Sequence, residues 1–264
     1  MQPVAVLQGV PAPPPVVGYQ QKDVTDGVYN FMTATFDKLS GTYTLGDIGV
    51  NSDFVYSTLS FLDENAATKS FTIDGFAVDQ FYYYFAADLD GTAFEGQPGW
   101  YFVDDDAGDL HSANSIPVPY GSTFYIEGQE DGAQIVFAGS VSDTDIPVDV
   151  EDGVYNFMGN CTPVNLTLGD ITVNDAFVYS TLSFLDENAA TKSFTIDGFT
   201  VDQFFYYFEA DLDGTAFEGQ PGWYFVDDDA GDLHSANSIP VNAGDTFYIE
   251  GQDDGAQVII PSAL

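Results

Sequence analysis

The chain contains nearly the same sequence twice. Residues 55–76 (VYSTLSFLDENAATKSFTIDGF) recur unchanged as residues 178–199, and residues 88–118 recur as 211–241, so both pairs are offset by 123 positions. The repeat units of solenoids and propellers have about 20–50 residues, whereas a period of this length matches a small complete domain. The sequence therefore predicts two copies of one domain in tandem.

The local pattern is that of β-strands. Short runs rich in Tyr, Phe, Val, Ile and Thr are separated by Gly, Asp, Asn and Pro, and helical periodicity is hard to find. In the first copy we expect strands at residues 27–36, 42–50, 54–63, 69–76, 78–87, 100–104, 123–128 and 133–138. This spacing predicts an all-β protein of two tandem antiparallel β-sandwich modules, jelly-roll or Ig-like.

The repeat also sets the expected domain boundaries. Residues 1–22 form an apolar strand with a proline-rich spacer, 23–139 the first sandwich, 140–150 a linker and 151–264 the second sandwich. The linker is acidic, with one proline and no glycine, so the modules should sit in line with limited freedom. The copies diverge mainly where residues 33–44 of the first correspond to the shorter 159–167 of the second. This difference indicates either drift in a surface turn or a place where the copies meet different neighbours.

The charge of the chain excludes some partners. It has 42 acidic residues, 4 lysines and no arginine, which gives a net charge of -38. Nucleic acids and anionic membrane surfaces should repel such a chain, and no run approaches the roughly 20 apolar residues of a membrane helix. Because 45% of residues are hydrophobic, the chain can still bury a core. Bound cations or salt would screen the surface charge, and adaptation to high salinity is an alternative origin for it.

The N-terminal extension is the first candidate functional segment. Residues 4–10 are apolar and strand-like, and the proline-rich residues 11–15 that follow favour a stiff polyproline helix. Such a strand can add to the sheet of the next subunit and produce head-to-tail self-polymerisation. Packing against its own chain and disorder are the alternatives. The candidate polymerisation residues are Val4, Val6, Leu7 and Val10.

Two identical acidic loops are candidate calcium sites. Carboxylates punctuated by glycine suit the six to eight oxygen ligands of calcium, although the spacing is not that of an EF-hand. Turn formation by Asp and Gly explains the same pattern. Each loop also carries a histidine, His111 or His234, which is either a solvated loop residue or a pH sensor. The candidate metal ligands are Asp104, Asp106, Asp109, Asp227, Asp229 and Asp232.

Aromatic residues and the single cysteine each allow two interpretations. Trp100 and Tyr101, repeated as Trp223 and Tyr224, are candidate glycan-binding residues because sugars stack on rings, but core filling is the simpler explanation for them. Cys161 has no counterpart in the first copy and is either a buried apolar residue or the site of an intermolecular disulfide.

No catalytic arrangement stands out, so we predict that the protein is not an enzyme. The sequence has no nucleophile with a base and its orienting group, no phosphate loop and no cofactor fingerprint, although carboxylates are numerous enough for a glycosidase pair. In general composition the chain is similar to bacterial or archaeal surface-layer, fibre and adhesin proteins. We expect an extracellular or cell-surface structural subunit that assembles with itself into a fibre or lattice, with calcium stiffening the acidic loops. The alternative is a bivalent calcium-dependent glycan-binding adhesin.

Overall fold

The computed structural model describes residues 16–38, 41–73, 75–78, 81–86, 89–104, 107–177, 180–202, 204–209, 212–227, 231–252 and 254–263. The protein is built from antiparallel β-sheets, which confirms the predicted all-β fold class. In this part of the chain the helical elements are two short 3-10 turns, η1 (Leu45–Asp47) and η2 (Leu168–Asp170). None of the helices described here has the length and hydrophobicity needed to cross a membrane.

The strands of residues 16–140, called the N-terminal half below, are short. They are β1 (Val17–Asp23), β2 (Tyr29–Thr33), β3 (Gly49–Val50), β4 (Thr58–Phe61), β5 (Phe71–Ile73), β6 (Phe76–Val78), β7 (Tyr82–Phe85), β8 (Gly99–Val103), β9 (Leu110–Ser112), β10 (Thr123–Glu127) and β11 (Gln134–Ser140).

The strands of residues 146–263, the C-terminal half, repeat this series with small differences. They are β12 (Ile146–Val150), β13 (Tyr155–Gly159), β14 (Leu166–Thr167), β15 (Thr172–Val173), β16 (Thr181–Phe184), β17 (Phe194–Ile196), β18 (Phe199–Val201), β19 (Phe205–Phe208), β20 (Gly222–Val226), β21 (Leu233–Ser235), β22 (Pro240–Val241), β23 (Thr246–Glu250) and β24 (Ala256–Ile260).

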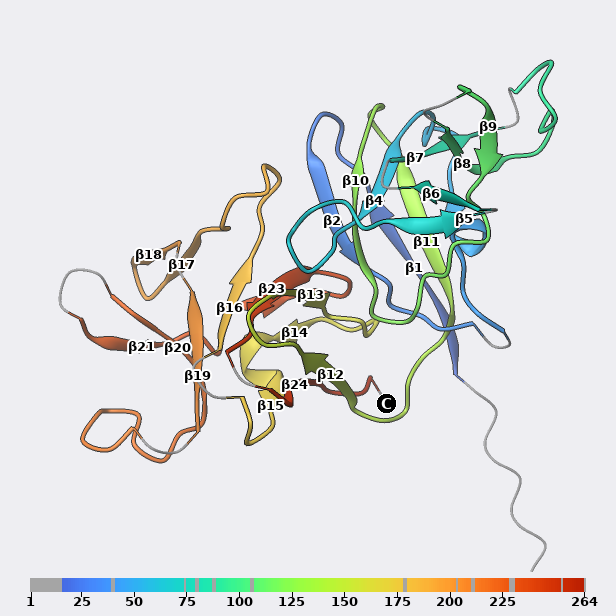
Figure 1. Ribbon diagram of the computed structural model, residues 1–264. Helices are drawn as coiled ribbons and strands as arrows, with labels where there is room; N and C mark the ends of the chain where they lie inside the picture. The colour runs from blue at the N-terminus through green and yellow to red at the C-terminus, as the bar shows by residue number, and fades with distance from the viewer. Residues whose placement is uncertain are drawn as a thin grey trace, which may run out of the picture.

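Each half contains a three-stranded and a six-stranded sheet (Figure 1). In the N-terminal half their orders are β1-β11-β3 and β2-β10-β4-β7-β8-β9, and in the C-terminal half they are β12-β24-β15 and β13-β23-β16-β19-β20-β21. Two-stranded ribbons β5-β6, β17-β18 and β14-β22 complete the structure. Every sheet in the described part of the chain takes its strands from one half. The division into two domains with the boundaries given above stays a prediction.

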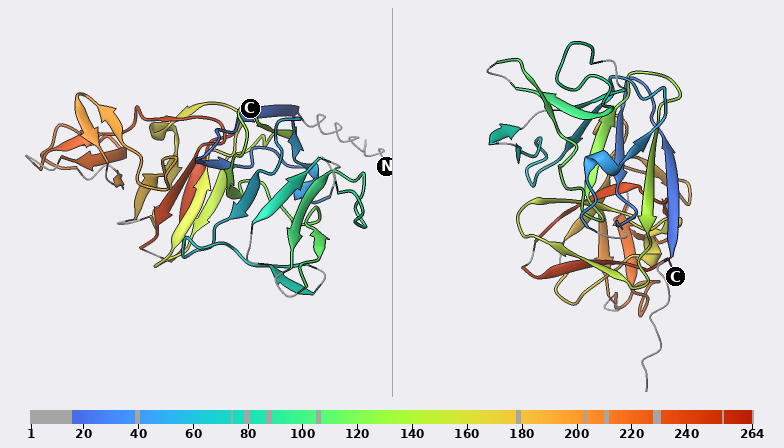
Figure 2. Two further views of the ribbon diagram at one scale, coloured as in Figure 1. Left: turned by 90° about the horizontal axis from the view of Figure 1, so that it is seen from above. Right: turned by 90° about the vertical axis from the view of Figure 1, so that its right-hand side faces the viewer.

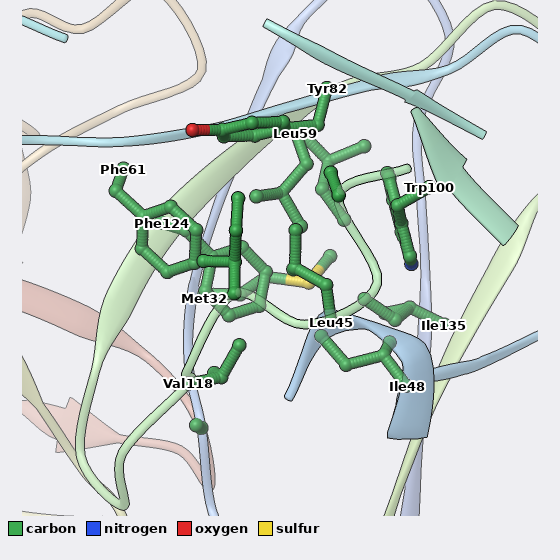
Figure 3. Close-up of a cluster of buried hydrophobic side chains, with 14 of the residues drawn as sticks. Met32, Leu45, Ile48, Leu59, Phe61, Tyr82, Trp100, Val118, Phe124 and Ile135 are labelled. Atoms are coloured by element: carbon green, nitrogen blue, oxygen red, sulfur yellow. The ribbon is translucent and has the colours of Figure 1, made fainter. Parts of the chain in front are cut away.

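The core of the N-terminal half lies between its two main sheets (Figure 3). Strand alternation directs Leu59 and Phe61 of β4 and Met32 of β2 inward, where they are buried. The rings of Phe124 on β10 and Phe137 on β11 approach to 5.9 Å between centroids and connect the six-stranded sheet to the three-stranded one. This layered packing is that of a β-sandwich, and a second cluster of buried side chains repeats it in the C-terminal half.

The structure places strands in two segments that the prediction assigned to the spacer and to the linker. Residues 17–22, assigned to the spacer, form most of β1 and pair with β11 over their whole length. In the predicted linker, residue 140 belongs to β11 and residues 146–150 form β12, which pairs with β24. Both strands end within a shared D-V-x-D-G motif, Asp23 to Gly27 and Asp149 to Gly153. That motif marks equivalent positions in the two copies and is the signal by which both strands could have been recognised.

The two halves contact each other directly, which the prediction of modules joined only by a linker did not anticipate (Figure 2). The backbone N–H of Tyr29 donates a hydrogen bond to the carbonyl oxygen of Glu187 at 3.1 Å. At the equivalent positions, the N–H of Tyr155 donates to the carbonyl oxygen of Glu64, also at 3.1 Å. Because each contact is the repeat equivalent of the other, the interface has an approximate two-fold symmetry.

The segments in which the copies diverge lie at this interface. Thr33 Oγ1 is 3.0 Å from Thr246 Oγ1 of the other half. The residue equivalent to Thr33 is Gly159, where a Cβ atom would collide with the Thr33 hydroxyl and the Asp245 carbonyl oxygen. Tyr120 of the N-terminal half packs against the C-terminal core. These positions favour the interpretation that the divergent segments meet different neighbours, since the two halves are each other's neighbours here.

Candidate functional site

The most distinctive cavity in the described part of the chain lies where the two halves meet. It has a volume of about 430 Å³, within the range of small-molecule pockets. Each half contributes two tyrosines, a phenylalanine, a leucine and an alanine at equivalent positions of the repeat. We call this cavity the aromatic pocket, and its lining residues are Tyr29, Phe31, Leu62, Ala66 and Tyr125 with Tyr155, Phe157, Leu185, Ala189 and Tyr248.

Strand register places the aromatic side chains on the outer face of the six-stranded sheet. In β2, Tyr29 and Phe31 point away from the core, whereas Met32, the residue after Phe31, is buried in it. Phe31 pairs with Tyr125 of β10 across the ladder. In the C-terminal half Phe157 pairs with Tyr248 in the same way. The period of two along each strand therefore builds one half of the pocket from each copy.

The rings in the aromatic pocket are positioned by contacts with one another. The centroids of Tyr29 and Tyr125 are 5.2 Å apart with planes at 83°, and those of Tyr155 and Tyr248 are 5.5 Å apart at 85°. Edge-to-face pairs of this kind contribute about 0.5–1.5 kcal/mol beyond the burial of their area. Both pairs are thus held in a defined geometry even though Tyr29 and Tyr155 are partly exposed.

Tight turns from both halves complete the walls. Asp63 Oδ1 accepts hydrogen bonds from the N–H groups of Asn65 and Ala67, both at 2.9 Å, and Ala66 has a φ of 59°. Ala189 has the same φ in the equivalent turn, and there the N–H groups of Ala190 and Asn188 lower the pKa of Asp186. A left-handed conformation costs an alanine on the order of 1–3 kcal/mol. Both strained alanines line the aromatic pocket, so the strain lies at the cavity.

Carboxylates outnumber lysines around the aromatic pocket. A smaller cavity lies on each side of it, and each has three acidic residues and one lysine in its lining. Those residues are Asp63, Glu64, Asp149 and Lys69 on one side and Asp186, Glu187, Asp245 and Lys192 on the other. The ammonium groups of Lys69 and Lys192 lie 5.7 and 5.4 Å from the ring centroids of Phe71 and Phe194. The surroundings therefore combine ring faces with an excess of negative charge.

In the acidic loops, Asp104 and Asp227 occupy structural positions. The Asp104 carboxylate accepts hydrogen bonds from the N–H groups of Ala107 at 2.5 Å and Asp109 at 3.2 Å, and it lies 3.0 Å from His111 Nε2. The Ala107 N–H and the His111 side chain hold the pKa of Asp104 below its ordinary value. His234 Nε2 and Asp227 repeat the 3.0 Å contact. The turn-forming role expected as the alternative is thus observed for Asp104.

Of the other predicted calcium ligands, Asp109 and Asp232 join this arrangement through their backbone N–H groups, which donate to Asp104 and Asp227. Asp109 and Asp232 are exposed, whereas Asp106 and Asp229 lie outside the described residues. Within the described ranges, no three His, Cys, Asp or Glu side chains are grouped so that they could hold a metal ion. Calcium binding by these loops stays a prediction.

The predicted glycan-binding residues are corrected to core residues. Trp100 and Trp223 have no exposed surface, and Tyr101 and Tyr224 are 1% exposed. A sugar cannot stack on these rings because the sheets and the loop after β7 and β19 enclose them, with Phe94 packed on Tyr101 at 5.0 Å. Cys161 is also buried, and burial raises the pKa of its thiol to about 11. This agrees with its interpretation as a small apolar residue.

The predicted polymerisation residues Val4, Val6, Leu7 and Val10 lie outside the described residues. The described chain begins next to β1, an edge strand of its sheet, where Tyr19 is 72% and Val17 60% exposed. An open groove of about 510 Å³ runs beside this strand. It is lined by Val17, Gly18, Lys38, Tyr43, Asp47, Ala138 and Gly139.

Sequence reasoning missed the aromatic pocket. Its signal was the motif V-Y-N-F-M, present in both copies, in which Tyr and Phe alternate with residues of the opposite face. The motif alone gives no sign that two such faces meet. Comparisons with protein-family models, with curated proteins and with solved structures found no match for this chain, so the functional argument depends on the geometry.

Proposed function

We propose that this protein is an extracellular structural subunit that assembles into a surface fibre or lattice by donating its N-terminal strand, residues 4–10, to a neighbouring subunit. The observation that carries the proposal is the exposed apolar edge of β1, with Tyr19 and Val17 among the most exposed large apolar side chains of the described chain. Natural sheets usually protect such an edge, because its unpaired backbone groups are a template for another strand.

The groove beside β1 supports the proposal. Ala138 leaves room above the sheet because its side chain is small and exposed, and Tyr43 provides an apolar wall. The donated strand would pair with the β1 edge and place alternate side chains in this groove. Since the donor segment and the acceptor edge are different parts of one chain, each subunit can both give and receive a strand, as a head-to-tail contact requires.

Calcium has an accessory place in this proposal. A folded surface of net charge -38 repels its copies unless cations screen it. Asp109 and Asp232 are exposed and free to contribute to such screening. Assembly should therefore be stronger with calcium than with a chelator. The four candidate aromatic residues of the glycan-binding alternative are buried in the core, so they give it no support.

Negative-stain electron microscopy of five samples tests the proposal. The full chain should form filaments. A chain lacking residues 1–15 retains only the acceptor edge, and the variant Val17→Lys/Tyr19→Lys retains only the donor strand, because two lysines on the edge block pairing. Neither should polymerise alone, and an equimolar mixture of the two should give discrete 1:1 dimers. Tyr206→Lys, at another exposed tyrosine, is the control and should still polymerise. Monodisperse single particles from the full chain, with calcium or without, would contradict the proposal.

A further inference from the structure

The aromatic pocket has the features of a binding site for an organic cation. The negative face of an aromatic ring attracts cations, and the attraction grows when the cation is desolvated among several rings. Four tyrosines and two phenylalanines from the two halves surround one cavity of about 430 Å³. We propose that the aromatic pocket binds a small molecule carrying a quaternary ammonium group.

The charges around the cavity favour a cation over an anion or a neutral molecule. Glu127 pairs with Tyr29 and Glu250 pairs with Tyr155 in the strand ladders. Cross-strand partners lie on the same face of a sheet, with their Cβ atoms about 4.5–5.5 Å apart. One carboxylate therefore lies beside Tyr29 and another beside Tyr155. The flanking cavities add three carboxylates for each lysine. With a net charge of -38 on the whole chain, the field draws cations toward this site.

A quaternary ammonium fits the chemistry of the walls better than a primary amine. The pocket's rings, leucines and alanines contribute apolar surface, and none of its described lining residues has a carboxylate that could pair with a primary ammonium, which would lose strong hydration on entering. Methyl groups on nitrogen spread the charge, reduce that hydration and contact ring faces directly. The protein itself places Lys69 and Lys192 near phenylalanine rings at the rim, outside the cavity.

The pocket also has a defined shape before a ligand enters. The edge-to-face tyrosine pairs and the Asp63 and Asp186 turns hold both walls. The Tyr29 and Tyr155 backbone hydrogen bonds fix the halves relative to each other. A preformed site loses little conformational entropy on binding. This proposal does not depend on polymerisation, since none of the residues that line the aromatic pocket belongs to residues 1–15 or to β1.

The probes that test it are choline and its neutral isostere 3,3-dimethylbutan-1-ol, which has the same shape without the charge. In proton NMR, binding among ring faces should shift the choline methyl signal upfield in a saturable way. The shift should persist in 0.5 M NaCl, where the Debye length falls to about 4 Å and diffuse counterion attraction is screened. The isostere should bind at least tenfold more weakly.

Three double or single variants assign the effect to the aromatic pocket. Tyr29→Leu/Tyr155→Leu should raise the choline Kd at least tenfold, whereas Tyr29→Phe/Tyr155→Phe keeps the ring faces and should raise it less than threefold. Tyr206 lies on the same sheet face outside the pocket, so Tyr206→Leu should leave the choline Kd unchanged. Equal binding of choline and the isostere would overturn the proposal. So would the absence of any shift of the choline methyl signal, a shift that disappears in 0.5 M NaCl, or a choline Kd that the leucine variant leaves unchanged.

Discussion

Tyr29 and Glu187 belong to different halves of the chain and are joined by a hydrogen bond of 3.1 Å from the Tyr29 N–H to the Glu187 carbonyl oxygen. Together with its repeat equivalent, Tyr155 to Glu64, this bond joins the edge of a sheet in one half to a tight turn in the other. The two copies therefore do more than repeat a fold. Each provides one wall of a cavity that neither has alone.

Cys161 should report on the integrity of the interface. It is buried beside residues of the other half, and burial raises the pKa of its thiol to about 11. We expect almost no reaction with a thiol reagent at pH 8 in the native protein, because little thiolate forms and access is closed. In urea the thiol should react at the rate of a free cysteine. Rapid labelling of the native protein would show that the halves separate readily.

Lys22 contributes little to stability at neutral pH, and its contribution depends on pH. Burial lowers its pKa from 10.5 despite Asp245, whose carboxylate lies 3.7 Å away. The unfolded chain therefore holds the proton more tightly, which disfavours folding below the folded-state pKa. That penalty is lost as the pH rises toward 10.5. Lys22→Met should change the unfolding free energy at pH 7 by no more than about 1 kcal/mol.

Urea denaturation of the wild type and Lys22→Met from pH 7 to 10.5 measures this effect. The wild type should gain stability relative to the variant across the interval, while Asp245→Ala, which leaves the lysine without its partner, should be less stable than the wild type at pH 7. A difference between wild type and Lys22→Met that stays constant with pH would rule out the assigned titration.

Asp104 should stabilise the folded protein at neutral pH, and this stabilisation should be lost in acid. Its folded-state pKa lies below the ordinary value because of the Ala107 N–H and His111. A carboxylate of this kind contributes stability above its unfolded pKa of about 3.9 and loses it as the pH falls through the folded pKa. Asp104→Asn should therefore be less stable than the wild type at pH 6 and equal to it near pH 2. Thermal melts at both pH values test this, with the exposed Asp143→Asn as a control that should show no difference at either pH.

The repeat and the strand pattern predicted the fold class because both are local properties of the chain. Strands such as β8 and β10 follow directly from runs of aromatic and β-branched residues. β1 and β12 were missed because their mixed sequences, VGYQQKD and IPVDV, gain strand structure from pairing with β11 and β24.

The site was harder to predict because it depends on contacts between distant segments. For Trp100 the core was the simpler prediction and a sugar-binding surface the alternative, since an aromatic residue in an alternating strand can face either way and only the packed sheets show which. Tyr29 and Tyr155 line one cavity from opposite sides of the interface between the halves, and the periodicity of the strands does not predict that interface. The three-residue difference between the copies near Thr33 and Gly159 was the one local trace of that interface.

Cross-linking in a mixture of two variants, each with one added cysteine, tests the central proposal, donation of the N-terminal strand, most directly. One chain carries Val6→Cys in the donor segment and the other Tyr19→Cys on the exposed acceptor edge; the native Cys161 is buried and stays unreactive. With a short bismaleimide, strand donation predicts a cross-link that joins residue 6 of one chain to residue 19 of the other, abundant in the mixture and absent from either variant alone. A cross-link between these positions that forms only when both substitutions are in the same chain, and stays within it, would contradict the account.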